Sequence, residues 1–298
     1  MWRYIGATRP MFLTVSVVGC GIGFSIAFAQ SGTLPWGACA LAVIIAVAGQ
    51  GSANVINDLA DAENGTDAIN TDRISPFTGG SRFLQDGVLS LQQVRILAVV
   101  TIGLVVIAGI GLLTHLRAWE LAWVGVAAMA IGWAYSAPPF QLMSRGVWGE
   151  AAIVAAWALI VVGSSMLSTH QVSAMAMTLG LAYGAMVANI LYANQIPDIR
   201  ADRSVGKFTL AVQVPRQRLW VPYVGFLLAA YAGLFFSMGT LGVSPWILLG
   251  AVSLPLSYRA VNILKRGRFE RMVMTRALQA TILSAHVFGV GVAVGLLI

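Results

Sequence analysis

The sequence predicts an all-α integral membrane protein with nine transmembrane helices, and two observations support this fold class: the composition and the distribution of charge. Of 298 residues, 58% are hydrophobic and only 10% are charged, and the mean hydropathy is +0.81. A soluble domain carries about 25% charged side chains and cannot hide this much apolar surface. The composition therefore excludes a soluble enzyme, a disordered chain and a nucleic-acid-binding protein, despite a net charge of +7.

Nine stretches of the chain are long and apolar enough to cross a membrane. A helix that spans the hydrocarbon layer, about 30 Å thick, needs about 20 apolar residues. The eighth stretch is short and contains Pro245 and Pro255, which membrane helices tolerate. No small-residue cleavage signal follows the first stretch, so we interpret it as a retained span. The predicted spans are 11–29, 36–56, 92–113, 119–136, 148–167, 172–193, 219–238, 243–257 and 276–297.

The basic residues predict the orientation of these spans. With the N-terminus inside, every Lys and Arg except Arg117 falls on the cytoplasmic side, as the positive-inside rule requires. We therefore expect an integral protein of the cell (plasma) membrane, with a cytoplasmic N-terminus and the C-terminus outside. Most acidic residues lie in two long cytoplasmic loops, about 57–91 and 194–218, which places the expected active site on that side. The whole chain, 1–298, is predicted to be a single transmembrane domain.

Two acidic clusters lie at the cytoplasmic ends of the second and sixth spans. Residues three or four apart on a helix share a face, so each cluster presents several oxygen ligands on one side of its helix. The same arrangement of oxygen-bearing side chains thus occurs twice in the chain, once at each helix end. Its members are Asn57, Asp58, Asp61 and Asp67 in the first cluster and Asn194, Asp198 and Asp202 in the second.

Carboxylates placed this close together need a shared counter-ion. Oxygen ligands suit Mg²⁺, which proteins usually hold with one or two carboxylates and substrate phosphate. We therefore expect Mg²⁺ as the cofactor, with two ions bridging a diphosphate. Nearby basic residues would bind the remaining phosphate oxygens; they are Arg73, Arg145, Arg203 and Lys207. Solvated loops with paired acids and bases are the alternative, but ionisable groups at membrane depth are costly and usually functional.

The two clusters resemble the aspartate-rich motifs of the UbiA superfamily of intramembrane prenyltransferases. The matching segments are Asn57-Asp58-Leu59-Ala60-Asp61, followed by Asp67, and Asp198-Ile199-Arg200-Ala201-Asp202. The resemblance covers essentially the whole chain and implies a UbiA-like fold of nine helices with both motifs cytoplasmic. It further implies a polyprenyl diphosphate and an aromatic acceptor as partners, in contact with membrane lipid and without nucleic acid. Asp61 and Asp198 are then expected to be catalytic.

Other segments are similar to one branch of that superfamily, the 1,4-dihydroxy-2-naphthoate polyprenyltransferases of menaquinone synthesis. The third aspartate of the common motif falls on Gly65, and Asp67 follows two residues later, so Asp67 would bind metal either directly or through water. Further segments of this kind are 64–67, 72–80, 202–210 and 276–286, the last ending at His286, which could equally be a core histidine.

The connection after the fourth span contains another resemblance. In the family, a tyrosine and a basic residue at this place contact the diphosphate or the allylic carbon. Tyr135 and Arg145 match best, which makes Tyr135 the third expected catalytic residue, although their spacing is looser than the family pattern. An aromatic anchor at the membrane interface is the alternative for Tyr135. Arg9-Pro10 resembles a family motif before the first helix and equally fits an inside-flanking anchor.

These features predict a Mg-dependent prenyltransferase, in which fixed positive charge stabilises the departing diphosphate. An electron-rich ring, most simply 1,4-dihydroxy-2-naphthoate, then attacks the allylic carbon inside a cavity that excludes water. Three alternatives stay open at this stage. They are a UbiA-type enzyme for another acceptor such as 4-hydroxybenzoate, homogentisate or a natural-product ring, an intramembrane terpene cyclase, and, more remotely, a transporter.

Overall fold

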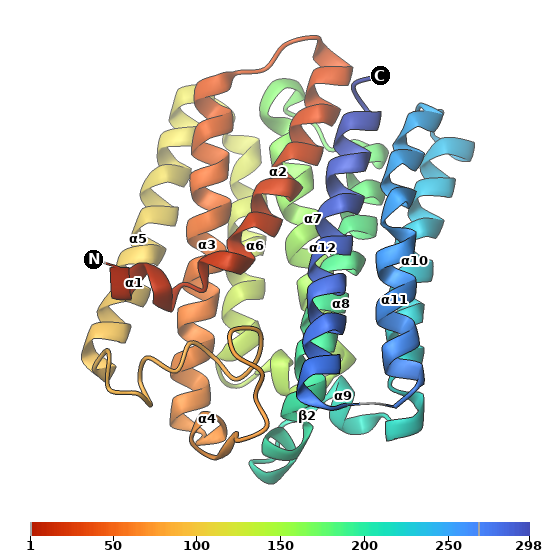
Figure 1. Cartoon of the computed structure of the whole chain (residues 1–298). Helices are drawn as coiled ribbons and strands as arrows, with labels where there is room; N and C mark the ends of the chain where they lie inside the picture. Colours follow the sequence, from red (N-terminus) through yellow and green to blue (C-terminus); the bar gives the residue numbers. More distant parts are fainter. Residues whose placement is uncertain (1, 268) are drawn as a thin grey trace.

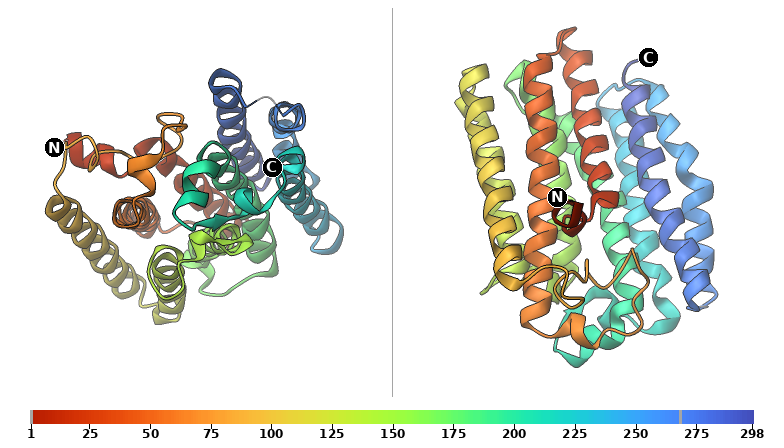
Figure 2. Two further views of the ribbon diagram at one scale, coloured as in Figure 1. Left: turned by 90° about the horizontal axis from the view of Figure 1, so that it is seen from below. Right: turned by 60° about the vertical axis from the view of Figure 1, so that its left-hand side comes forward.

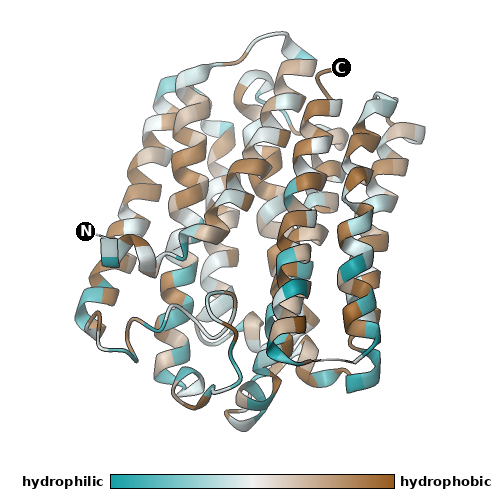
Figure 3. Cartoon of the chain, viewed as in Figure 1, coloured by the Kyte–Doolittle hydropathy of each residue, from teal (hydrophilic) through white to brown (hydrophobic). Residues whose placement is uncertain are grey.

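The computed structural model describes residues 2–267 and 269–298, so Arg268, one of the basic residues expected at the cytoplasmic face, lies outside the described residues. The chain is almost entirely helical, and its long helices run side by side in one bundle (Figure 1). Hydrophilic residues gather toward one end of the bundle, where the long loops lie (Figure 3). We call this the polar end.

Eight helices in the described residues are long and apolar enough to cross a membrane. Seven are continuous α-helices, and the eighth begins as the 3₁₀ segment η4. That segment starts at Pro245, and Pro255 lies in the first turn of the α-helix that follows it. The eight are α2 (Pro10–Ser31), α3 (Trp36–Glu63), α5 (Leu91–Leu116), α7 (Val147–Thr169), α8 (Ala174–Ser204), α10 (Trp220–Thr240), η4 with α11 (Pro245–Ser253 and Leu254–Lys265) and α12 (Arg271–Gly295).

The fourth predicted span, 119–136, differs from the expectation in length. It consists of the short 3₁₀ segment η1 (Trp119–Leu121) and helix α6 (Ala122–Ser136), which has 15 residues. Helix α6 ends where Pro138 and Pro139 follow, because proline disfavours a helical conformation in the residue before it and cannot donate a backbone hydrogen bond. The predicted fold class is confirmed, with α6 shorter than a full span.

Short elements connect the helices, mostly at the polar end (Figure 2). The two strands β1 and β2 pair in parallel, with Arg145 opposite Phe208 and Gly146 opposite Thr209. This pairing ties the start of α7 to the segment that follows α8. The short elements are α1 (Trp2–Ala7), α4 (Thr66–Ile69), η2 (Leu142–Ser144), β1 (Arg145–Gly146), β2 (Phe208–Thr209), α9 (Leu210–Gln213) and η3 (Arg216–Arg218).

Helix α8 forms the centre of the bundle, in contact with α2, α7, α10 and α12. Small residues allow this close packing, as in many membrane proteins. A Cβ atom on Gly184 would lie 2.5 Å from the carbonyl oxygen of Val154 in α7, and one on Gly23 of α2 would lie 2.4 Å from Ser164 Cβ. A larger residue at either position would push these helices apart, so the glycines set how closely α8 and its neighbours pack around the second acidic cluster.

Polar side chains on α3 fix the start of α2. The amide groups of Gln50 and Asn54 donate hydrogen bonds to the backbone oxygens of Phe12 and Thr8, at 2.9 Å each. Between α1 and α2, Arg9 adopts a left-handed conformation with φ of 54°, and its guanidinium forms an ion pair with Asp58 of α3. The turn before the first span thus places the guanidinium of Arg9 against the first acidic cluster.

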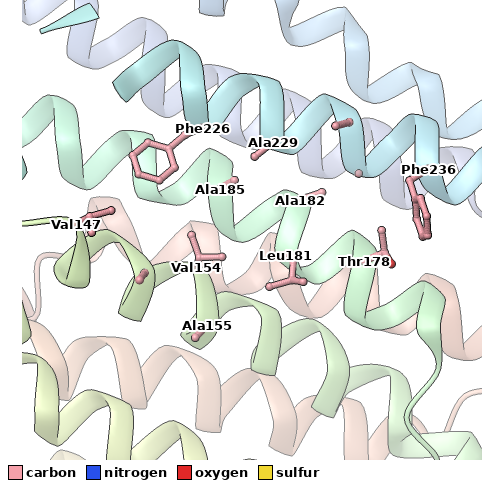
Figure 4. Close-up of a pocket in the computed structure, with 13 residues that line it drawn as sticks. Val147, Val154, Ala155, Thr178, Leu181, Ala182, Ala185, Phe226, Ala229 and Phe236 are labelled. Atoms are coloured by element: carbon pink, nitrogen blue, oxygen red, sulfur yellow. The ribbon is translucent and has the colours of Figure 1, made fainter. Parts of the chain in front are cut away.

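An apolar groove of about 700 Å³ lies between α7, α8 and α10, away from the acidic clusters (Figure 4). Its lining is almost entirely aliphatic or aromatic, with Phe226 and Phe236 toward opposite ends of the labelled row. Such a surface suits contact with hydrocarbon chains of the bilayer, and the chemistry must lie elsewhere.

The orientation of the bundle can be tested with cysteine accessibility. Ser204 and Thr240 are both exposed, at the last residues of α8 and α10, which run in opposite directions through the bundle. We expect Ser204→Cys to react with a membrane-impermeant thiol reagent only from the cytoplasmic side and Thr240→Cys only from outside. The unmodified protein is the control, because Cys20 and Cys39 are buried. Labelling of both positions from one side would contradict the span count between them.

Candidate active site

A polar cavity of about 100 Å³ lies at the polar end of the bundle, between α3, α8, the end of α6 and the loop that follows α4. It brings together members of both acidic clusters, which are far apart in the sequence. The predicted site residues that line it are Asn57, Asp61, Asp67, Tyr135, Asn194, Asp198, Asp202 and Lys207.

Lys207 joins the two clusters. Its Nζ atom lies 2.8 Å from Asp61 Oδ1 and 3.6 Å from Asp202 Oδ1, and all three side chains are nearly buried. Burial alone would lower the pKa of Lys207, but the carboxylates of Asp61 and Asp202 raise it above its ordinary value. Lys207 therefore stays charged. It serves as a fixed cation between two helices.

Asp58 is the one member of the first cluster that does not line the cavity. It is paired with Arg9, which does line it, and it accepts a hydrogen bond of 3.1 Å from the backbone N–H of Ser81. Arg9 is thus the second cation of the site. The resemblance of Arg9-Pro10 to a family motif was the one signal in the sequence that pointed to this role.

Asp67 is almost fully buried and accepts a hydrogen bond of 3.2 Å from Gln85. Burial, followed by the neighbouring charges of Asp61 and Asp58, raises the pKa of Asp67 to about 7, against the opposing effect of Arg9 and Lys207. Gly80 passes between two carboxylates, because a Cβ atom there would lie 2.8 Å from Asp67 and 3.1 Å from Asp58. Only glycine fits this close approach, and its φ of 71° is also favourable only for glycine.

Asp198 holds the loop between α4 and α5. Its carboxylate accepts hydrogen bonds from Asn70 Nδ2 at 2.7 Å, from Thr78 Oγ1 at 3.0 Å and from the backbone N–H of Gly79 at 3.2 Å. The sequence predicts no role for Asn70, although the nearby segment 72–80 is similar to one branch of the family. The hydrogen bonds run between helix and loop, so no helical periodicity reveals them.

Three predicted phosphate-binding residues do not line the cavity. The guanidinium of Arg203 donates to the backbone oxygen of Val212 at 3.0 Å, and that of Arg145 donates to Pro139 at 2.7 Å. Arg73 packs beside Gly79 in the loop. The pairing of β1 with β2 holds Arg145 at the rim, which leaves Arg9 and Lys207 as the cations at the cavity in the described residues.

Two further polar contacts connect these helices. Gln195 lines the cavity and donates a hydrogen bond of 2.8 Å to Glu150, which is completely buried. His286 contacts Thr14 at 2.8 Å and Ile282 at 2.8 Å, and it therefore connects α12 to α2. This contact fits the structural interpretation of His286, which is not part of the cavity.

The donor set of the cavity fits Mg²⁺. The oxygen Oδ1 of Asn194 is buried without a hydrogen-bond partner in the described residues. The acidic side chains that line the cavity are all aspartates, which would offer carboxylate oxygens to a metal. Mg²⁺ is usually held by one or two carboxylates from protein, with phosphate and water as its other ligands. Among the described residues, no three acidic, histidine or cysteine side chains converge closely enough to hold a metal by themselves.

Comparison with known proteins identifies relatives of this chain. The sequence matches the UbiA prenyltransferase family over residues 16–295. The 1,4-dihydroxy-2-naphthoate octaprenyltransferase of Mycobacterium tuberculosis is 28% identical over 271 residues, covering 90% of this chain and 88% of the relative. The protein of the same name from Mycobacterium leprae is 28% identical over 294 residues, covering 98% and 95%.

Solved structures support the fold. The apo structure of a UbiA homolog from Aeropyrum pernix K1 matches with a TM-score of 0.69 at 15% identity, over 94% of this chain and 97% of that one. The structure of a UbiA homolog from Archaeoglobus fulgidus bound to GPP and Mg²⁺ matches with a TM-score of 0.61 at 13% identity, over 97% and 99%.

The contribution of the Thr78 hydroxyl to holding the loop against Asp198, which we call the clasp, can be tested by substitution. Thr78→Val removes the donor to Asp198 and the acceptor for Ile74 N–H. A hydrogen bond to a charged group contributes about 1.5–3 kcal/mol, so loop amides in 70–81 should exchange hydrogen roughly ten times faster or more in protein without metal. Hydrogen-exchange mass spectrometry measures this. Thr101→Val is the control, since Thr101 bonds only to its own helix; equal exchange in both variants contradicts the clasp.

Proposed function

The chain belongs to the UbiA prenyltransferase family, and from this premise we propose that it transfers a polyprenyl group from its diphosphate to 1,4-dihydroxy-2-naphthoate in menaquinone synthesis. The family consists of enzymes that move prenyl groups, which excludes the transporter alternative. The observation that carries the proposal is that two aspartate clusters meet around Lys207 in one cavity. The names of the mycobacterial relatives support the naphthoate acceptor.

The carboxylates of both clusters would hold Mg²⁺, with Asn57 and Asn194 as further ligands and two ions bridging the diphosphate; the Archaeoglobus fulgidus homolog is described as bound to GPP and Mg²⁺, which supports this assignment. When bound, the metal supplies positive charge that neutralises the leaving diphosphate. Asp58 is held by Arg9 and would act from the edge of the site. Asp67 would need to be ionised to bind metal, as carboxylate ligands are.

Arg9 and Lys207 would contribute fixed positive charge where negative charge develops as the carbon–oxygen bond to diphosphate breaks. Both line the cavity, and carboxylates on neighbouring helices hold them in place. Arg73, Arg145 and Arg203 lie farther out and would contact the diphosphate only on its approach. Arg9 and Lys207 would therefore be the side chains that stabilise the diphosphate while the carbon–oxygen bond breaks.

Tyr135 lies in the same cavity as the carboxylates, and its ring would stabilise the allylic cation through its π face. The ring carbon of the naphthoate that bears the carboxyl group then forms a bond to the allylic carbon. Carbon dioxide then leaves from that position, and the electron pair of the broken carbon–carbon bond restores the aromatic ring, so no proton is taken up there. The apolar residues Phe77 and Leu191 also line the cavity and would keep water from the cation.

We further propose that a single transmembrane domain spanning 1–298 carries this activity in the plasma membrane, with the cavity on the cytoplasmic side. The distribution of the basic residues supports this orientation. Both substrates would then reach the site from the cytoplasmic side, and the polyprenyl tail would remain among apolar helices.

Removal of the metal or of a carboxylate tests the site. We expect turnover to require a divalent cation and to fall at least a thousandfold in Asp61→Ala, Asp198→Ala and Asp202→Ala, because each loses an oxygen ligand whose charge positions the leaving diphosphate. Product formation from polyprenyl diphosphate, followed by mass spectrometry, measures this. Glu63→Ala is a matched control on α3, since Glu63 is exposed and pairs only with Arg95 in the described residues. Near-normal turnover in Asp61→Ala or Asp198→Ala would falsify the proposed metal site.

The acceptor can be tested with purified protein, Mg²⁺ and a panel of aromatic compounds. We expect a prenylated, decarboxylated naphthol from 1,4-dihydroxy-2-naphthoate and no comparable product from 4-hydroxybenzoate or homogentisate. The reason is that a dihydroxylated fused ring is more electron-rich and attacks a loose cation readily. Mass spectrometry identifies the products. Turnover of either monocyclic acceptor without turnover of the naphthoate contradicts the acceptor, and an isoprenoid product without any acceptor indicates a cyclase.

A further inference from the structure

The amide of Gln195 has a fixed orientation at the edge of the cavity. Its Oε1 atom accepts a hydrogen bond of 3.2 Å from the backbone N–H of Ala211, which can only donate. Its Nε2 atom must therefore be the group that contacts Glu150 Oε1, at 2.8 Å. The side chain is 7% exposed and lines the cavity. Since an amide nitrogen carries two hydrogens, one N–H of Gln195 remains available to a molecule in the cavity.

Glu150 is an unusual residue for a purely structural role. It is completely buried in the first turn of α7, and its second oxygen, Oε2, has no hydrogen-bond partner within the described residues. An acidic group buried in a membrane protein is costly and usually functional. Among the described residues, Gln195 supplies the one side-chain hydrogen bond to Glu150. The carboxylate of Glu150 is therefore placed to orient the amide of Gln195.

The position of Gln195 selects which substrate it meets. Helix α8 runs toward the polar end, and Gln195 precedes Asp198 by three residues and Asp202 by seven. At 1.5 Å per residue, its Cα atom lies about 4.5 Å and about 10 Å deeper along the helix than those of the two aspartates. Asn194 lies at a similar depth, but among the described residues its Oδ1 atom has no partner and suits a metal. The Oε1 atom of Gln195 is already bonded to Ala211, so Gln195 offers an N–H, which suits an oxygen of the reacting ring.

From this geometry we propose that Gln195 donates its free N–H to an oxygen, hydroxyl or carboxylate, of the aromatic acceptor, and that Glu150 is the positioning residue that fixes the amide for this contact. The inference rests on the proposed function and deepens it, because it assigns acceptor recognition to a pair that the metal site does not use. It needs no group other than those in the chain and the acceptor. An acceptor that lacks oxygen at that place would leave the donor unpaired and bind less tightly.

An exchange of the two residues separates recognition from structure. In the double variant Glu150→Gln with Gln195→Glu, position 150 donates to position 195, and Ala211 N–H still has its acceptor. The pair is preserved, but the cavity now faces an oxygen that cannot donate. We expect the KM for the acceptor to rise at least tenfold while the KM for polyprenyl diphosphate and the melting temperature stay unchanged.

Single variants of Glu150 test the positioning role. Glu150→Leu removes the acceptor for Gln195 Nε2 and should raise the acceptor KM about tenfold, whereas Glu150→Gln keeps an oxygen there and should restore a value within about threefold of the wild type. A normal acceptor KM in the exchanged variant, or an increase confined to the diphosphate KM, overturns the proposal. An equal loss in Glu150→Gln and Glu150→Leu overturns the positioning role.

Equilibrium binding of 1,4-dihydroxy-2-naphthoate, measured by calorimetry on the full-length protein without diphosphate, requires no turnover. We expect the exchanged variant to bind at least ten times more weakly than the wild type, and equal binding overturns the proposal. Failure of the wild type to form product, with this difference in binding retained, contradicts the proposed function alone. If the wild type uses another aromatic acceptor, the same comparison is made with that compound.

Discussion

Buried negative charge at the polar end of the bundle is the constraint on which the rest of the structure depends. Five aspartates meet there from helices α3, α4 and α8, and in the described residues only Arg9 and Lys207 form ion pairs with them. Breaking a buried pair by loss of one partner costs about 3–5 kcal/mol, because a charge is left without compensation. Lys207 therefore does more than balance charge. It links Asp61 at the end of α3 to Asp202 at the end of α8, so loss of its charge would leave both carboxylates without their cation.

Neutral donors supply the compensation that the two cations cannot. Asp198 takes three hydrogen bonds from the loop after α4, and Asp58 takes another from the Ser81 backbone. The backbone N–H groups of Gly79 and Ser81 are paired in this way, as buried backbone groups generally are. The glycines at 79 and 80, both with positive φ, let the backbone reach the carboxylates directly. The irregular path of this loop is therefore a consequence of the charge it covers.

The sequence predicted the parts of this arrangement that depend on the helical repeat of side chains. Apolar runs located the helices, and the spacing of Asn57 with Asp61 and of Asn194 with Asp198 placed both clusters on defined faces. It could not predict the partners supplied by loops, such as Asn70, because a hydrogen bond between a loop and a distant helix leaves no periodic trace. Arg73, Arg145 and Arg203 have the right chemistry, but backbone turns and the β1–β2 pairing keep them outside the cavity. For Glu150, the one available signal was an acid beside a predicted span.

The small size of the cavity follows from this charge balance. Sites for small molecules are typically about 300–1,000 Å³, whereas the polar cavity measures about 100 Å³. The loop between α4 and α5 and the two cations already surround the carboxylates, and their side chains and backbone occupy the space beside them. Asp198 and Asp58, which hold the loop, are also members of the proposed metal site. Under the proposed function, a bound cation would therefore compete with the loop donors for the lone pairs of the same two carboxylates.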